Sequence, residues 1–474
     1  MDIEEFRRLG HEVVDFIADY RARTAKGEFP VMSRASPGAI RAALPATPPA
    51  EPQSLDDVLE ELRRLIVPGC THWQDPRFFA YFPSNSSLAA VLGDFLSTGL
   101  AQLGLNWQAS PALTEIEELA TDWLRQMLGL SDTWSGVIQD TASTATLVAL
   151  ICARERTTGY GAARGGLQAS ERPLMVYSSS QSHSSVEKAA LLAGFGRENL
   201  RVVAVDERCG MSAEALGRAV AADMAAGHAP CAIVATVGST ATTAIDPLEA
   251  IAGIARAHGL WLHVDAAMAG SAMILPECRP LWQGIEQADS LVLNPHKWLG
   301  ASFDCSTYFV RDPQHLVRVM STNPSYLRTA ADAKVRNFRD WGIPLGRRFR
   351  ALKLWLLIRE QGVRGLQQRL RRDLEHARWF AAQVDSTPGW QRLAPVPFQT
   401  VCVRHVPQGM AGEALDTHTL AWVRRINESG RAYLTPAMLG DRWMVRVSFG
   451  VEATEREHVV ALWQQMREEA ERGG

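Results

Sequence analysis

The sequence predicts an α/β fold with a mainly parallel central β-sheet, and three observations lead to this prediction. Short apolar runs alternate with helical patterns in the middle of the chain, as consecutive strand–helix–strand units do. The last of these runs and the next apolar run after it deliver an acid and a lysine, Asp265 and Lys297, to the strand ends where open α/β sheets bind ligands. The last segment mixes half-buried strands with helices, which is typical of a small α+β domain. The alternating runs lie at 174–177, 201–205, 231–237 and 260–264, with helical patterns near 184–194, 212–226 and 247–258.

The first helix is predicted at residues 3–22, where apolar side chains recur at helical spacing. A proline-rich linker follows, and a second helix begins at Ser54 and ends at Pro68-Gly69. This segment is too extended to bury its own apolar stripe. The stripe therefore packs either on the large domain of the same chain or on a second subunit. Its residues are Ile3, Phe6, Leu9, Val13, Ile17 and Tyr20.

Residues 72–84 form an aromatic-rich loop. So many aromatic side chains indicate either a part of the core or the wall of a pocket for a flat ring. In the second case Ser84 would be the polar contact. The loop contains Trp73, Phe78, Phe79, Tyr81 and Phe82, followed by Pro83 and Ser84.

Between 85 and 160 the pattern is mostly helical, and near residue 136 a short apolar run leads into a helix. Thr141, Ala142 and Ser143 fall near the first turn of that helix. Free backbone N–H groups and the helix dipole favour an anion such as a phosphate there. An ordinary helix cap without a ligand has the same pattern.

Asp265 and Lys297 are the residues around which the chemistry is predicted. A carboxylate that ends a buried strand needs a partner, and a pyridinium N–H is one; a strand-end turn or helix cap is the alternative. Lys297 follows an apolar strand and the turn Asn294-Pro295. A lysine shielded from water there can lose its proton and bond to an aldehyde. Pyridoxal phosphate enzymes pair the ring nitrogen with an acid and the aldehyde with a lysine.

Other loops contribute further candidates. His183 lies just before a helix, where its ring is either structural or stacked on a cofactor, and Thr240 follows another strand. Residues 321–346, which include Tyr326, are either a mobile lid or a solvated loop. Helices are predicted from about 347 to 362 and over 363–383.

The C-terminal segment completes a small domain. Strands are predicted at 400–406 and 443–449, and helices at 413–428 and 455–471, the last with Thr454 and Glu457 as a capping box. We expect an N-terminal helical segment that packs on the partner subunit (1–84), a large cofactor domain (85–384) and a small α+β domain (385–474).

Composition excludes several classes of protein. The chain has 474 residues, 46% hydrophobic and 21% charged, with a net charge of −3, so nothing favours a nucleic-acid or anionic-membrane partner. No signal peptide or membrane span is predicted. Seven scattered cysteines without CxxC predict reduced thiols in a cytoplasmic protein and no metal site.

Nearly the whole chain resembles the pyridoxal-phosphate-dependent aromatic L-amino-acid decarboxylases (group II, fold type I), and looks closest to their bacterial DOPA-decarboxylase-like branch. The resemblance implies helices on both faces of the sheet, a homodimer with shared active sites, and conversion of an aromatic amino acid, L-DOPA favoured, to the amine and CO2. L-tryptophan, 5-hydroxytryptophan, L-tyrosine and L-phenylalanine are the other expected substrates. The motifs include THWQDPRFFAYFPS, LNWQASPALTEIEELATDWL, GVIQDTASTATLVAL, SQSHSSVEKAALLAG, LWLHVDAAMAGSAMILPECR, LNPHKWLG and GIPLGRRFRALKLW.

The resemblance also implies residue roles. Lys297 would hold the cofactor aldehyde, Asp265 the pyridine nitrogen, and His183 would stack on the ring. Tyr326 matches the lid tyrosine that supplies a proton. The cofactor site would further include Ala142, Ser143, Thr240, Asn294, His296 and, from the partner subunit, Gly346; the substrate pocket would include Trp73, Tyr81, Phe82, Pro83, Ser84 and His183, with Leu103 and Leu105 from the partner subunit.

Two departures from the animal members, Met268 and Ser84-Asn85, and a slightly shorter lid put the ring preference in doubt. An aromatic aldehyde synthase is the main alternative, but such enzymes resemble this pattern with Phe or Asn in place of Tyr326 or His183. A regulator with a degenerate fold would need an added DNA-binding domain or a lost lysine, and neither is visible. An acidic amino-acid decarboxylase is disfavoured because the loop from Phe78 to Ser87 has no basic residue.

Overall fold

The computed structural model describes residues 1–169, 172–322, 325–327, 329–332 and 334–472. The chain forms two compact units. The larger unit comprises Ser84–Leu374 and Ala394–Phe398, and the smaller comprises Met1–Pro83, Glu375–Leu393 and Gln399–Gly474. The N-terminal segment therefore belongs to the same compact unit as the C-terminal domain.

A seven-stranded sheet forms the centre of the larger unit, in the order β1-β7-β6-β5-β4-β2-β3. Strands β3, β2, β4, β5 and β6 run parallel, whereas β7 is antiparallel to both of its neighbours, β6 and β1. The predicted α/β fold with a mainly parallel sheet is confirmed. The strands are β1 (Ser135–Gln139), β2 (Leu174–Ser179), β3 (Leu200–Val203), β4 (Ala229–Thr236), β5 (Trp261–Asp265), β6 (Ser290–Leu293) and β7 (Ser306–Val310).

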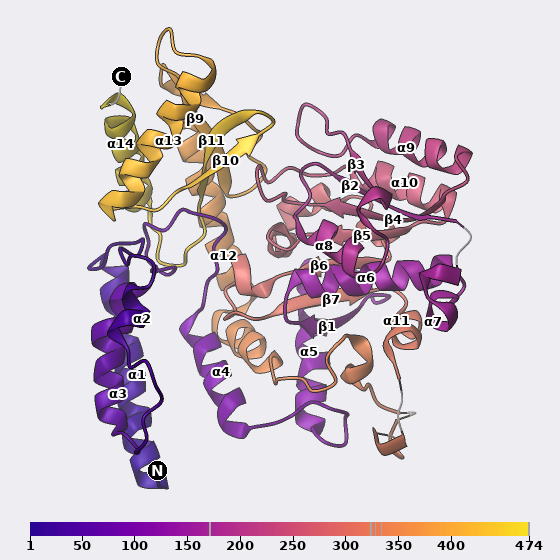
Figure 1. Cartoon of the computed structure of the whole chain (residues 1–474), viewed down its shortest axis with the longest axis horizontal. Helices are drawn as coiled ribbons and strands as arrows, with labels where there is room; N and C mark the ends of the chain where they lie inside the picture. Colours follow the sequence, from indigo (N-terminus) through magenta and orange to yellow (C-terminus); the bar gives the residue numbers. More distant parts are fainter. Residues whose placement is uncertain (170–171, 323–324, 328, 333, 473–474) are drawn as a thin grey trace. The chain divides into compact units, whose positions relative to one another are not determined.

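Helices cover both faces of this sheet (Figure 1). Helix α6 packs against α8 and against the middle strands, while α9 and α10 pack against each other and against β4. Helices α6 and α8 begin a few residues after β1 and β2, which places their first turns at the carboxyl edge of the sheet. The helices of this unit are α4 (Leu88–Leu100), α5 (Pro111–Leu128), α6 (Ala142–Thr157), α7 (Ala162–Gly165), α8 (Ser185–Leu192), α9 (Ala213–Ala225), α10 (Leu248–His258) and α11 (Pro313–Met320).

The smaller unit contains a four-stranded antiparallel sheet in the order β10-β11-β9-β8. Helix α12 begins in the larger unit and ends in the smaller one, and Gly362 breaks its helical geometry with a φ of 62°, where the sequence predicts a boundary between two helices. The elements are α1 (Ile3–Ala25), α2 (Ala39–Ala43), α3 (Leu55–Glu61), α12 (Ala351–Ser386), β8 (Trp390–Arg392), β9 (Thr400–His405), α13 (Gly412–Ser429), β10 (Thr435–Leu439), β11 (Arg442–Ser448) and α14 (Arg456–Glu471).

The predicted cap of α14 is wrong. Glu455, not Thr454, caps the helix, and its backbone N–H donates to Nδ1 of His458 (3.1 Å) in a capping box. The Thr454 hydroxyl instead donates to the Pro76 carbonyl (2.8 Å), a long-range partner that no local pattern reveals.

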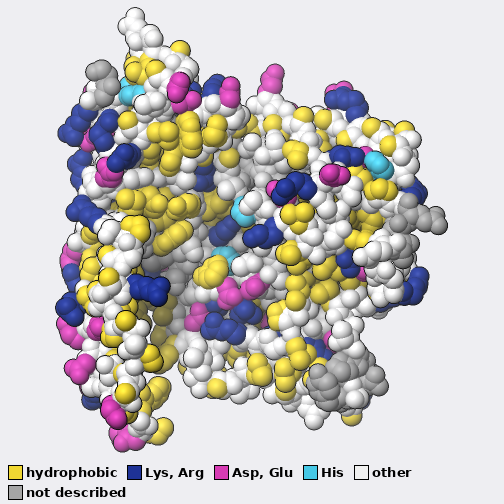
Figure 2. Space-filling model, in the orientation of Figure 1, with side chains coloured by type: hydrophobic (Ala, Val, Ile, Leu, Met, Phe, Trp, Pro, Cys, Tyr) yellow, Lys and Arg dark blue, Asp and Glu magenta, His cyan; other side chains and the backbone are white. Residues whose placement is uncertain are grey.

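The apolar stripe predicted on α1 is only partly covered within the chain. Leu9 is buried, but Ile3 and Phe6 are exposed, and hydrophobic side chains are visible along the N-terminal helices in Figure 2. In the larger unit, α4 likewise exposes Leu88, Leu92, Phe95, Leu96 and Leu100, each by about half of its surface.

Candidate functional site

Lys297 lies in a distorted turn that follows the central strand β6. The turn, Pro295–Leu299, is π-helical in its hydrogen bonding, but Lys297 itself has φ −99° and ψ −108°. The Asn294 carbonyl accepts the Lys297 N–H (2.9 Å), and the Asn294 N–H donates to the Ala267 carbonyl (2.9 Å). Every other residue of the turn is buried, whereas Lys297 is partly exposed. The turn therefore offers one amine at the carboxyl edge of the sheet.

Asp265 is the last residue of β5, the strand beside β6. It pairs with Thr236 of β4 on one side and with Val292 of β6 on the other, so it stands between two parallel strands in the middle of the sheet. Its side chain is 4% exposed, and Oδ1 accepts the N–H of Ala267 (3.0 Å). A buried carboxylate with one backbone donor can accept a further N–H on its outer side.

His183 precedes α8 and shares its electrostatic surroundings with both of these residues. The Ser185 N–H donates to its Nδ1 (3.1 Å), and the Ser185 hydroxyl lies 2.8 Å from the same atom, so the ring proton is assigned to Nε2. The ring remains exposed, yet partial burial lowers its pKa; the Asp265 charge opposes this shift and the Lys297 charge adds to it. His183, Asp265 and Lys297, which lie far apart in sequence, thus lie close together in space.

The side chains of Asn294 and His296 accept hydrogen bonds that connect the lysine turn to the start of β7. Oδ1 of Asn294 accepts the Ser306 hydroxyl (2.7 Å), and Nδ1 of His296 accepts the Cys305 N–H (2.9 Å). Burial, followed by the charge of Lys297, lowers the pKa of His296 to about 3, so this ring stays neutral. Both side chains thereby fix the start of β7 against the turn that carries Lys297.

The predicted phosphate residues lie at the first turn of α6. Thr141 is the N-cap, and its side chain accepts the Thr144 N–H (3.4 Å). Ala142 is buried and Ser143 is exposed, so the backbone can be approached while a hydroxyl stands beside it. Because the first N–H groups of a helix have no partner within the helix, this end can bind an anion. Thr240 is exposed in the turn after β4, which Gly238 opens with a φ of 84°.

Leu103, Leu105 and Gly346, expected to serve the partner's site, lie on two paired segments. The backbones of Gly104 and Arg347 exchange two hydrogen bonds (2.9 and 3.1 Å). Leu103 is exposed and Leu105 is half-buried, and a Cβ on Gly346 would lie 3.4 Å from Cδ1 of Leu103. These apolar side chains thus gather beside a glycine at the surface.

The aromatic loop lies in the smaller unit and divides into two parts. The Trp73 and Tyr81 rings are exposed and stacked, with centroids 5.6 Å apart, and the Tyr81 hydroxyl lies 3.2 Å from that of Tyr433. Phe82 is buried beneath the Arg446 guanidinium (4.8 Å), and Pro83 is also buried. The loop therefore supplies both core residues and an open aromatic face.

Ser84, the first residue of the larger unit, is half-buried, and its Oγ donates to the His296 carbonyl over 3.4 Å. Tyr326 lies in a short 3-10 turn, Ser325–Leu327, but its side chain is outside the described residues. The Leu327 carbonyl accepts the Asn106 amide (3.4 Å), which ties this turn to the segment that carries Leu103 and Leu105.

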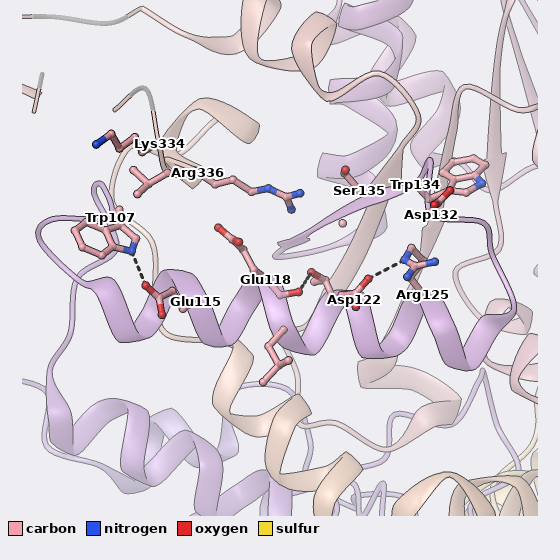
Figure 3. Close-up of a pocket in the computed structure, with 14 residues that line it drawn as sticks. Trp107, Glu115, Glu118, Asp122, Arg125, Asp132, Trp134, Ser135, Lys334 and Arg336 are labelled. Atoms are coloured by element: carbon pink, nitrogen blue, oxygen red, sulfur yellow. Dashed lines mark hydrogen bonds and ion pairs between the residues drawn. The ribbon is translucent and has the colours of Figure 1, made fainter. Parts of the chain in front are cut away.

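A cavity of about 880 Å³ opens along α5, apart from these residues (Figure 3). Glu115, Glu118 and Asp122 line it from α5, and on the other side the Arg336 guanidinium extends towards Glu118, whereas the Lys334 amine points away. Burial raises the pKa of the Glu118 carboxyl, and the positive charge of Arg336 opposes this rise. The lining includes none of the predicted site residues.

In the described part of the chain, no group of three or more His, Cys, Asp or Glu side chains is placed to hold a metal ion. Within the same residues, no helix has the length and apolar character needed to cross a membrane.

Sequence reasoning missed several residues that organise this region. Ser306, the first residue of β7, and the preceding Cys305 support the lysine turn. Strand β7 was not predicted, although its residues Ser-Thr-Tyr-Phe-Val favour a strand. Glu117 and Arg347 form a buried ion pair beside β1. The available signal for Glu117 was its place on the apolar stripe of α5, between Leu113 and Leu124.

Comparisons with known proteins give the family and the fold of the chain. The family described as the pyridoxal-dependent decarboxylase conserved domain matches residues 37–406. The chain is 42% identical to a phenylacetaldehyde synthase of Arabidopsis thaliana over 99% of this chain and 96% of that protein. It is 40% identical to tryptophan decarboxylase 2 of Oryza sativa subsp. japonica, covering 99% and 95%. The crystal structure of Oryza sativa TDC with PLP and tryptamine superposes with a TM-score of 0.96 at 37% identity, covering 100% of this chain and 99% of that one.

Proposed function

Because the chain belongs to the pyridoxal-dependent decarboxylase family, we propose that it removes the carboxyl group of an aromatic L-amino acid and releases the aromatic amine and CO2. The observation that carries this proposal is the convergence of Lys297, Asp265 and His183 at the carboxyl edge of β5 and β6. The two relatives reported above are a phenylacetaldehyde synthase and a tryptophan decarboxylase, both from plants. Placement of this chain in a bacterial DOPA-decarboxylase-like branch is therefore not supported.

The side chains present fit pyridoxal phosphate. An aldehyde requires an amine, a pyridine nitrogen requires an acid, and a phosphate requires N–H donors; Lys297, Asp265 and the first turn of α6 meet these requirements. When bound, the cofactor supplies the electron sink that stabilises the substrate carbon after CO2 departs. Lys297 would hold the aldehyde end through Nζ, and Ala142 and Ser143 would hold the phosphate.

The remaining residues orient the substrate and move protons. Asp265 would keep a proton on the ring nitrogen, because its buried carboxylate favours a positive partner. The neutral His183 ring would stack on the cofactor and direct its Nε2–H outward. Tyr326 would deliver a proton to the substrate α-carbon and, as part of a lid, exclude water while it does so.

An aldehyde synthase is the second candidate, because the Arabidopsis relative carries that name. In such a reaction the α-carbon meets O2, and oxygen and water are consumed as aldehyde, CO2, ammonia and hydrogen peroxide form. Tyr326 and His183 favour the decarboxylase, because a phenol and an imidazole can return a proton to that carbon before oxygen reacts.

L-DOPA remains the proposed preferred substrate, with tryptophan as the main competitor. Ser84 carries a hydroxyl, which can hydrogen-bond to a phenol or catechol. Gly346 lacks a side chain and leaves room for an indole, which favours tryptophan instead.

We also propose a homodimer that shares its active sites. The exposed apolar faces of α1 and α4, and the exposed Leu103 beside Gly346, support this assembly, because apolar patches of this kind mark interfaces.

A substrate panel tests the proposed function. The purified protein, loaded with pyridoxal phosphate, is given L-DOPA, L-tyrosine, L-phenylalanine, L-tryptophan, 5-hydroxytryptophan and L-glutamate, and amine release is measured. We expect turnover of aromatic amino acids and none of glutamate. Turnover of glutamate alone, or of nothing in the panel, would contradict the proposal.

A further inference from the structure

The buried ion pair between Glu117 of α5 and Arg347 lies outside every role assigned so far. Glu117 is 0% exposed and Arg347 is 6% exposed, and the two side chains meet in a bidentate pair of 3.0 and 2.6 Å. Removing two charges from water is costly, so a buried pair of this kind contributes little net stability. What the pair touches indicates why it is there.

Both members of the pair hold the same residue of β1. Glu117 Oε1 accepts the Ile138 N–H (2.8 Å), and the Arg347 guanidinium donates to the Ile138 carbonyl (2.6 Å). Strand β1 is at the edge of the sheet, so these backbone groups would otherwise face away from any strand. The ion pair therefore takes the place of a neighbouring strand.

Ile138 is close in sequence to the predicted phosphate turn. Strand β1 ends at Gln139, and Thr141 already caps α6, whose first residues are Ala142 and Ser143. A second contact reinforces the grip, since the buried Gln139 side chain donates to the Trp341 carbonyl (2.8 Å). The position of the phosphate turn is thus fixed against the segment that contains residues 341–347.

The backbone of Arg347 extends the connection to the segments proposed to serve the partner. It pairs in both directions with Gly104, which lies between Leu103 and Leu105, and it directly follows Gly346. One ion pair consequently joins the phosphate turn of a subunit to the two segments that this subunit would offer to the other active site.

We infer that Glu117 and Arg347 are positioning residues for the cofactor phosphate, which lock the turn at Ala142 and Ser143 to the segments around Gly104 and Gly346. This inference rests on the proposed function. The pair takes no direct part in the reaction. It acts through the backbone N–H groups that would donate hydrogen bonds to the phosphate.

The test separates phosphate binding from the rest of cofactor binding. Dissociation constants of the apoprotein are measured for pyridoxal phosphate and for pyridoxal, which lacks the phosphate, and their ratio reports the phosphate contribution. In Glu117→Gln this ratio should fall by on the order of tenfold, because displaced donors lose most of a charge-assisted hydrogen bond. Arg347→Lys, which keeps the charge but not the fork, should show the same change and serves as the test if Glu117→Gln does not fold.

Two matched controls exclude a general effect on folding. Glu118→Gln changes the next carboxylate of the same helix, which lines the cavity of Figure 3 instead of holding β1. Asp223→Asn weakens another buried carboxylate, bonded to Arg201 (2.7 Å) and Tyr177 (2.9 Å) away from the site. Both variants should keep the wild-type ratio of the two dissociation constants, whether or not their melting temperature falls.

An unchanged ratio in Glu117→Gln and Arg347→Lys, or an equal fall in Asp223→Asn, would overturn the inference and leave the pair a structural one. If the wild-type protein does not prefer pyridoxal phosphate to pyridoxal, the proposed function itself fails, and that outcome is read from the wild type alone.

Discussion

Asp265 lies directly opposite Val292 in the pairing of two neighbouring parallel strands, β5 and β6. The chain continues past Val292 for only a few residues before it reaches Lys297, so the carboxylate and the amine emerge at the same edge of the sheet. Both charges act on His183, with opposite effects on its pKa. This arrangement underlies the first two predictions.

Replacing Lys297 with alanine should abolish amine release and the visible absorbance of the lysine-bound cofactor. The amine is the one side chain of its turn that is not buried, so its loss should leave the fold intact. Lys188→Ala, at an exposed position of α8, is the control and should behave as wild type. Normal turnover in Lys297→Ala would remove this lysine from the reaction.

Asp265→Asn should retain the cofactor but lose activity by about 10²-fold or more, because a neutral amide cannot stabilise a protonated ring nitrogen. The measurement is kcat alongside cofactor content. If the soluble variant binds cofactor and keeps its kcat, Asp265 only caps the turn at Ala267.

The stability of the protein should decrease between about pH 6 and pH 4. Burial lowers the pKa of His263 to about 4 and that of His296 to about 3, so in this range the unfolded chain binds two protons that the folded chain does not. Burial raises the pKa of Asp246 to about 6, so the folded chain binds one that the unfolded chain does not. These three groups alone give the unfolded state a net excess of one proton, which lowers the free energy of unfolding by about 1.4 kcal/mol per pH unit.

Denaturant unfolding at several pH values measures this slope. His263→Gln removes one of the unfolded-state protons and should flatten the profile, whereas His258→Gln, at an exposed position, should not. A free energy of unfolding that is constant or increases as the pH falls from 6 to 5 would show that these histidines titrate normally.

Ser84→Ala should reduce kcat/KM for L-DOPA by about tenfold more than for L-phenylalanine, because only the catechol loses a hydrogen-bond partner. Ser86→Ala is the control, since the Ser86 hydroxyl lies 2.8 Å from that of Ser302. Equal losses for both substrates, or a wild type that prefers tryptophan, would count against the catechol proposal.

Tyr326→Phe should lower the rate of amine formation by about 10²-fold, the usual contribution of a positioned acid. The variant can still close a lid but has no proton to give, so part of each turnover should yield aldehyde, ammonia and peroxide in air. If it forms amine stoichiometrically at the wild-type rate, His183 becomes the leading proton donor.

Local sequence patterns predicted much of the fold and the chemical centre, because these features arise from residues that are close together in the sequence. Asp265 and Lys297 each follow an apolar strand, and the carboxyl edge of a parallel sheet brings such residues together. Long-range contacts carry no such signal. Three contacts depend on residues that are distant in sequence. They are the pairing of β7 with β1 and β6, the hydrogen bond from the Thr454 hydroxyl to the Pro76 carbonyl, and the hydrogen bonds of Glu117 and Arg347 to the Ile138 backbone.

A product balance on the wild-type protein tests the central claim most directly. CO2, amine, aldehyde and oxygen uptake are measured together for the preferred aromatic amino acid, in air and under nitrogen. A decarboxylase that uses Tyr326 and His183 as proposed should form one amine for each CO2 in both atmospheres and take up no oxygen. Aldehyde formed in proportion to CO2, with oxygen consumed and the reaction arrested under nitrogen, would contradict it.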